Sequence, residues 1–82
     1  MNKDQRETLD GRLYNLIEEL RGAWSRIGDC TQRQIGEGYE IGAYEKKEFR
    51  LIEHDLLNAL NRAKTLATFN QDQIQRVKPN AK

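Results

Sequence analysis

Few side chains in this sequence have the chemistry that metal binding requires. The 82 residues include one cysteine, Cys30, and one histidine, His54. A structural zinc site takes four ligands, mostly cysteine and histidine, which is more than this chain offers. The residues after His54, Asp55-Leu56-Leu57-Asn58, lack the glutamate and the second histidine of a zinc-protease helix. We therefore expect neither a metal nor a cofactor.

The candidates for catalysis lack partners at a suitable spacing. Ser25 and Thr31 have no histidine placed to complete a catalytic triad. Glu18 and Glu19 are adjacent in the chain, so on a helix their side chains diverge. General acid–base catalysis needs carboxylates that converge in a water-restricted pocket. The sequence predicts that the protein is not an enzyme.

The connector at residues 35–43 is glycine-rich but is not a phosphate-binding loop. It contains Gly36, Gly38 and Gly42. A phosphate loop would need a preceding strand and the G-x-x-x-x-G-K-[ST] or G-x-G-x-x-G spacing, and neither is present. We interpret this segment as a flexible turn.

Composition indicates a small, polar domain. Charged residues make up 33% of the chain and apolar residues 37%, with a formal net charge of +1. No apolar run approaches the length of a membrane span, and no signal-peptide core follows the start. A single cysteine excludes an intrachain disulfide and suits a reducing cytoplasm. We expect one helical domain over residues 1–78, a frayed tail at 79–82, and a cytoplasmic location.

Residues 3–27 and 43–69 have the periodicity of amphipathic helices, with apolar residues alternately three and four apart. The predicted seams are Leu9, Leu13, Leu16, Leu20, Ala23 and Ile27 in the first, and Phe49, Ile52, Leu56, Ala59, Ala63 and Leu66 in the second. Ile17 and Trp24 flank the first seam, and Leu60 and Ala67 flank the second. Asn2 and Gln5 have the form of a capping box.

The ends of both helices admit alternatives. Gly28 followed by Asp29 favours a break and then a short turn of helix; the helix could instead run straight through, with Cys30 as the next seam position. A break would place Cys30 at a helix N-terminus, a setting that activates thiols. We favour a small buried or half-buried cysteine instead. After the second helix, Asn70 has the form of a cap for a last short helix up to 78.

These elements predict an all-α fold, an antiparallel helical hairpin. Each apolar stripe, seam plus flanks, is wider than one partner helix covers, and a chain this small has a limited core of its own. We therefore expect a homodimer in which two hairpins form a four-helix bundle. The alternative is a three-helix monomer in which residues 70–78, or the segment after Gly28, fold back over the open face.

The outer face of the second helix carries the most specific surface feature. Six residues fall on one side of it at three- and four-residue spacing, with no acid among them, and we call them the basic strip. They are Lys47, Arg50, His54, Leu57, Asn61 and Lys64. Such a strip suits an acidic protein surface, with the leucine as an apolar anchor. We expect it to be the partner-binding site of a small interaction module, a regulator, adaptor or inhibitor.

Other uses of the surface stay open. The same strip from two subunits could contact phosphates, so the alternative function is a dimeric nucleic-acid-binding regulator; the balanced charge and the lack of a reader motif weigh against it. A purely structural oligomer is a third possibility. Near the connector, Tyr39 and Tyr44 with Ile35 and Ile41 either bury into a partner or close the end of the core.

Overall fold

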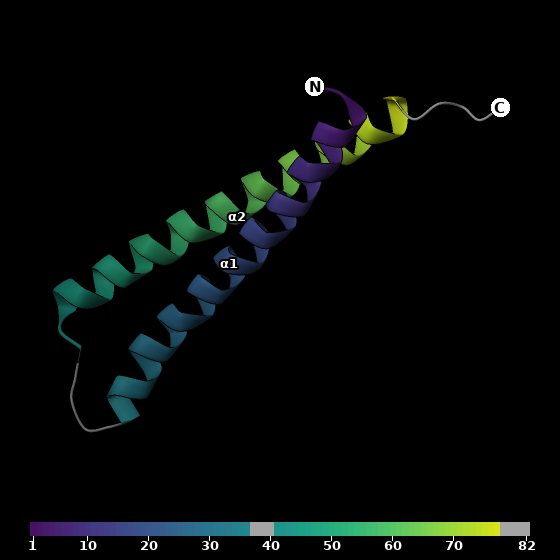
Figure 1. Ribbon diagram of the computed structural model, residues 1–82. Helices are drawn as coiled ribbons and strands as arrows, with labels where there is room; N and C mark the ends of the chain where they lie inside the picture. Colours follow the sequence, from purple (N-terminus) through teal and green to yellow (C-terminus); the bar gives the residue numbers. More distant parts are fainter. Residues whose placement is uncertain (37–40, 78–82) are drawn as a thin grey trace.

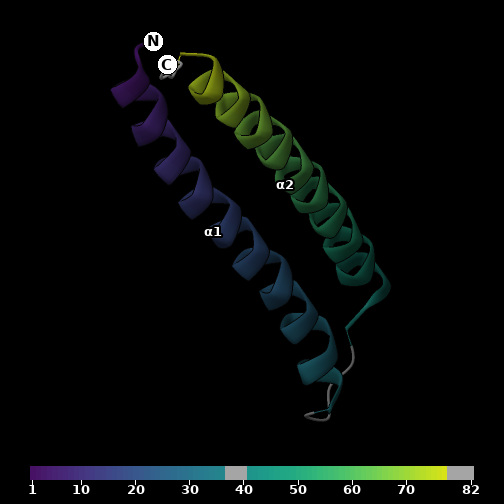
Figure 2. The same cartoon turned by 90° about the vertical axis from the view of Figure 1, so that its right-hand side faces the viewer.

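The computed structural model contains two long helices in an antiparallel hairpin, and it describes residues 1–36 and 41–77. Helix α1 spans Lys3–Gly36 and helix α2 spans Ala43–Val77. The helices lie side by side, with the end of α1 and the start of α2 at one end of the hairpin and the start of α1 and the end of α2 at the other (Figures 1 and 2). The molecule measures 65 × 18 × 16 Å. The predicted all-α hairpin is confirmed.

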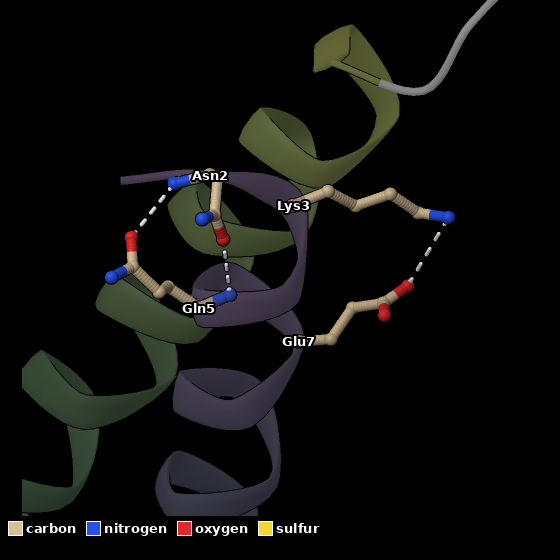
Figure 3. Close-up of polar contacts among 4 residues, drawn as sticks. All are labelled: Asn2, Lys3, Gln5 and Glu7. Carbon is tan, nitrogen blue, oxygen red and sulfur yellow. Dashed lines mark hydrogen bonds and ion pairs between the residues drawn. The ribbon is translucent and has the colours of Figure 1, made fainter.

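Helix α1 begins with the predicted capping box. The backbone N–H of Asn2 donates to Gln5 Oε1, and the backbone N–H of Gln5 donates to Asn2 Oδ1, each at 2.9 Å (Figure 3). These bonds satisfy two N–H groups that the first turn leaves without helical partners. Lys3 and Glu7 form an ion pair one turn apart at 3.8 Å, an exposed contact worth only about 0.2–0.5 kcal/mol. The hydrogen bonds therefore define this end of the helix.

The predicted break near Gly28 is wrong, because α1 continues through it to Gly36. Ile27 is buried, with 8% of its surface exposed. The Thr31 hydroxyl donates to the backbone oxygens of Ile27 at 3.2 Å and of Gly28 at 3.1 Å. Glycine inside a helix costs about 1 kcal/mol relative to alanine. Burial of one isoleucine contributes about 1.5–3 kcal/mol, which is enough to keep this turn helical.

The predicted separate helix after residue 69 is also wrong, because α2 continues to Val77. Asn70 is fully buried at the α1–α2 contact instead of capping a new helix. Its Nδ2 donates to the backbone oxygen of Arg6 at 2.8 Å, and its Oδ1 accepts from Arg6 Nη1 at 3.1 Å. Ile74, one turn later, is buried as well. These contacts hold the last turns of α2 against the start of α1.

The three-helix alternative fails for the same reason. Residues 70–77 extend α2, and the segment after Gly28 extends α1, so neither folds back over the open face (Figure 1). The expected tail at 79–82 and residues 37–40 of the expected connector lie outside the described residues.

The core lies along the line of contact between the helices, and it is rotated from the predicted seams. Its buried apolar residues are Leu13, Ile27, Ile41, Leu60, Ala63 and Ile74. Leu16, Ile52 and Leu66, all predicted to face the core, are 43%, 45% and 48% exposed. Leu60, predicted to flank the seam, is buried. A single neighbouring helix covers only part of a wide apolar stripe, so each helix leaves the other part open.

The buried amide of Asn70 generates a stability prediction. Asn70→Ala should lower the free energy of unfolding by about 1–3 kcal/mol, because both interhelical hydrogen bonds are lost and a small cavity remains. Urea unfolding followed by circular dichroism measures the change. Asn15→Ala, at an exposed position on α1, is the matched control and should stay within about 0.5 kcal/mol of the parent. Equal losses in the two variants would contradict this role for Asn70.

Candidate functional site

The structure places all six residues of the basic strip on the exposed surface of α2. The strip runs from Lys47 to Lys64, about 25 Å at 1.5 Å per residue. Within it, His54 Nδ1 lies 3.5 Å from Nδ2 of Asn58, a neighbour one turn later. Lys47, Arg50 and Lys64 are exposed to solvent, so the charges of the strip are open to another molecule.

Helix α1 adds a residue to this surface that the sequence did not place there. Trp24, 46% exposed, lines a shallow open hollow together with Arg50, Glu53, His54 and Leu57. Three of these four α2 residues belong to the basic strip. We call this feature the Trp24 hollow. The surface therefore spans both helices and is not confined to one face of α2.

The position of Trp24 follows from the register of the hairpin. Counting outward from the connector predicts Trp24 at the level of Phe49 and Ile52, which is close to its observed level. The sequence did not settle on which side of the contact line it lies. The structure places it on the side of Leu57, away from Ile52. The sequence signal that could have indicated this side is the position of Trp24 beside the predicted seam of α1, and not on it.

The Trp24 hollow combines apolar surface with charge. Trp24 and Leu57 are each close to half exposed, at 46% and 44%. Arg50 supplies a guanidinium, and Glu53, which is half-buried, supplies the one carboxylate of the hollow. Tryptophan and arginine are the residues most enriched at the centres of protein–protein interfaces. Chemically, the hollow suits an apolar side chain with an acidic neighbour.

The other candidate residues do not converge on a reactive site. Glu18 is paired with Arg21 at 3.1 Å on the exposed surface. Cys30 is half-buried inside α1, so the predicted helix start at Asp29, which would have activated its thiol, is wrong. Among the residues that the structure describes, no cluster of three or more His, Cys, Asp or Glu side chains could hold a metal ion.

The residues near the connector are divided between the core and the surface. Ile41 is buried, with 7% of its surface exposed, and closes the core at that end of the hairpin. Tyr44 is 71% exposed. Tyr39 and the side chain of Ile35 lie outside the described residues. Of the two uses predicted for this segment, Ile41 has the second, because it closes the end of the core, and Tyr44 remains exposed to solvent.

A second surface lies on the opposite side of the hairpin and is apolar. It consists of half-exposed side chains from both helices, and we call it the apolar face. Its members are Leu16 at 43%, Ile52 at 45%, Leu66 at 48% and Phe69 at 53% exposure. Trp24 and Leu57 lie on one side of the line where the two helices contact. Residues on the other side of that line, from both helices, therefore lie together on the opposite side of the hairpin.

Arginine side chains border the apolar face toward the open end of the hairpin. The guanidinium carbon of Arg6 lies 6.0 Å from the ring centroid of Phe69. A hollow beside Leu66 and Phe69 is also lined by Asn61, Arg62 and Thr65. Along the middle of the face the half-buried residues are Ala23 and Ala59, which would allow another helix to approach closely.

Comparison of the chain with models of protein families, with curated proteins and with solved structures finds no match. In the described part of the chain, neither helix has an apolar stretch long enough to cross a membrane. Function must therefore be inferred from the two surfaces above, one mixed apolar and basic, the other apolar.

The charge around Trp24, the sole tryptophan, can be tested by fluorescence quenching. The ratio of the iodide to the caesium quenching constant should be roughly twofold higher than for free N-acetyltryptophanamide, because Arg50 and the lysines of the basic strip attract anions. Stern–Volmer constants for the two ions measure the preference, and neutral acrylamide controls for exposure. Arg50→Glu should reduce or reverse the ratio. The same ratio in the parent protein as in N-acetyltryptophanamide would show that the cations do not control this hollow.

Proposed function

We propose that this protein is a small, non-catalytic interaction module that binds a partner protein through the basic strip and the Trp24 hollow. The observation that carries the proposal is the meeting of Trp24, from α1, with Arg50, His54 and Leu57, from the strip. Two long helices presenting a rigid, mixed surface can act as a regulator, adaptor or inhibitor by occupying the partner's surface. No chemical step is required of either helix.

The composition of the surface indicates the chemistry of the partner. Trp24 and Leu57 offer apolar area whose burial contributes about 25 cal/mol per Å². The cations of the strip favour a partner with acidic residues beside its apolar anchors. An amphipathic acidic helix meets both requirements, since its side chains recur at the same three- and four-residue spacing. The charges would mainly speed association and select the partner, while the apolar contacts would hold the complex.

The apolar face supports the second part of the proposal, that the module is a homodimer in the form of a four-helix bundle. Large half-exposed side chains at helical spacing on both helices form a surface that one hairpin leaves uncovered. Small chains commonly complete their cores by self-association. A second hairpin on this face would leave the Trp24 hollow free, because Trp24 and Leu57 lie on the other side of the line where the two helices contact.

The nucleic-acid alternative gains no support from the geometry of the strip. Glu53 lines the Trp24 hollow, and a carboxylate in that position opposes a phosphate. Binding to phosphates weakens steeply as salt rises. A titration of a DNA duplex at low salt tests the alternative, and we expect no saturable binding there.

Two leucines of α2 provide a matched test of partner binding. Leu57 and Leu51 have similar exposure, 44% and 50%, but lie about 120° apart around the helix. Leu57→Asp should lower partner affinity at least tenfold, because it places a carboxylate at the apolar centre of the surface. Leu51→Asp should not lower it. Both variants should keep the parent's helicity and melting temperature within a few degrees.

The measurement uses all three proteins as baits in extract from the host. Proteins retained by the parent and by Leu51→Asp, but lost with Leu57→Asp, are the candidates for the partner, and their affinities can then be measured with purified components. Identical sets of retained proteins on all three baits would contradict the assignment of this surface.

A further inference from the structure

We propose that the occupant of the apolar face is a second copy of this chain, related by a two-fold axis perpendicular to the helices. The axis would pass near Leu16 and Ala59, so that α1 packs antiparallel against α1 of the second copy and α2 against α2. This inference rests on the homodimer proposed above and specifies its geometry. It is carried by the spacing of the apolar side chains and by the charges along the two edges of the face.

The level of the axis follows from the register of the hairpin. The hydrogen bonds between Arg6 and Asn70 place these residues at the same height. Ten residues further along α1 is Leu16, and ten residues back along α2 is Leu60. A single perpendicular axis can therefore pass Leu16 and Ala59 with an offset of only one residue, about 1.5 Å.

This axis matches the apolar side chains of the two copies. Ile52 lies seven residues before Ala59 and Leu66 seven residues after it, so each faces the other across the dimer. Leu9 and Ala23 stand in the same relation to Leu16, a large residue opposite a small one. Such interdigitation is what close packing requires. Leu16, half exposed in the hairpin, would then pack against its own copy at the centre.

The charges at the edges of the face agree with the same axis. Along the edge of α1, Arg12 lies four residues before Leu16 and Glu19 three residues after it. Along the edge of α2, Asp55 and Arg62 stand in the same positions around Ala59. The two-fold rotation thus brings Arg12 to the level of the second copy's Glu19, and Asp55 to the level of the second copy's Arg62, each within about 1.5 Å along the helix.

These four charges are free for such pairing. In the part of the chain that the structure describes, the ion pairs are Lys3–Glu7 and Arg21–Glu18, which involve none of them. Exposed ion pairs contribute little to stability, so the apolar contacts would hold the dimer together. The charges would instead select one arrangement over another, which is the usual effect of complementary charge at an interface.

The competing arrangement has its two-fold axis parallel to the helices and pairs α1 with α2 of the second copy. At the register of the hairpin, that arrangement sets Arg12 beside the second copy's Arg62 and Glu19 beside its Asp55. Both of these pairs repel. A third pair along the same edges, Arg26 with the second copy's Glu48, is the one that attracts. Like charges in contact disfavour an assembly. The edge residues therefore favour the perpendicular axis.

A distance measurement separates the two arrangements. Spin labels on Tyr44→Cys, in a Cys30→Ser background, lie fifteen residues from Ala59 on an exposed position. With the perpendicular axis the two labels are about 45 Å apart along the bundle, and with the parallel axis both are at one end, within about 25 Å. Pulsed electron paramagnetic resonance should give the longer distance. The shorter distance in a stable dimer would overturn the proposed axis and leave the proposed homodimer standing.

Exchanging the charges of Arg12 and Glu19 provides a second, independent test, because the two arrangements predict opposite changes in the affinity of the dimer. Arg12→Glu should weaken the dimer about tenfold in sedimentation equilibrium, because the new carboxylate faces the second copy's Glu19. Adding Glu19→Arg should restore the parent's dissociation constant. In the competing arrangement, Arg12→Glu would face Arg62 and strengthen the dimer instead. Circular dichroism of each variant confirms that the hairpin is intact.

The mass of the parent protein in solution tests the homodimer on which this inference rests. A folded monomer at about 100 μM, a concentration at which a dimer with a micromolar dissociation constant would be mostly assembled, would overturn both the homodimer and its axis. A dimer with the expected label distance and charge response supports both. Neither outcome bears on partner binding by the basic strip, which the leucine variants test separately.

Discussion

Each helix of this protein has one neighbouring helix, and its apolar stripe is wider than one neighbour can cover. Most features of the structure follow from that constraint. The half of each stripe that faces the neighbouring helix forms the core, with Leu13 and Leu60 buried along it. The other half remains as the apolar face, where Leu16 and Leu66 are close to half exposed. A single hairpin cannot remove this surface from water.

The contacts at the two ends of the hairpin determine which half of each apolar stripe is buried. Asn70 holds the open end through its two hydrogen bonds with Arg6, and a buried polar residue at such a position specifies register more than it adds stability. Ile41 closes the other end. With both ends held, the rotation of each helix is set, and this rotation brings Trp24 beside the basic strip. The mixed surface and the apolar face are thus two consequences of one register.

The separation of the two surfaces has a functional meaning in the proposed arrangement. Self-association would use the apolar face, and partner binding would use the basic strip and the Trp24 hollow on the other side. A dimer with a perpendicular two-fold axis would carry two identical partner surfaces facing away from each other. Such symmetry allows two copies of a partner to be bound at once, a property that suits an adaptor.

The sequence by itself determined the helical class, the antiparallel hairpin, the capping box at Asn2 and Gln5, and the exposure of the basic strip, because helical periodicity and capping depend on neighbouring residues. It did not determine where the helices end or which half of each stripe is buried. Gly28 and Asn70 have local preferences for a break and a cap, and burial against the other helix outweighs both. The side on which Trp24 lies depends on interhelical register, which contacts 64 residues apart in the chain decide. Those contacts exist only once the two helices have packed together.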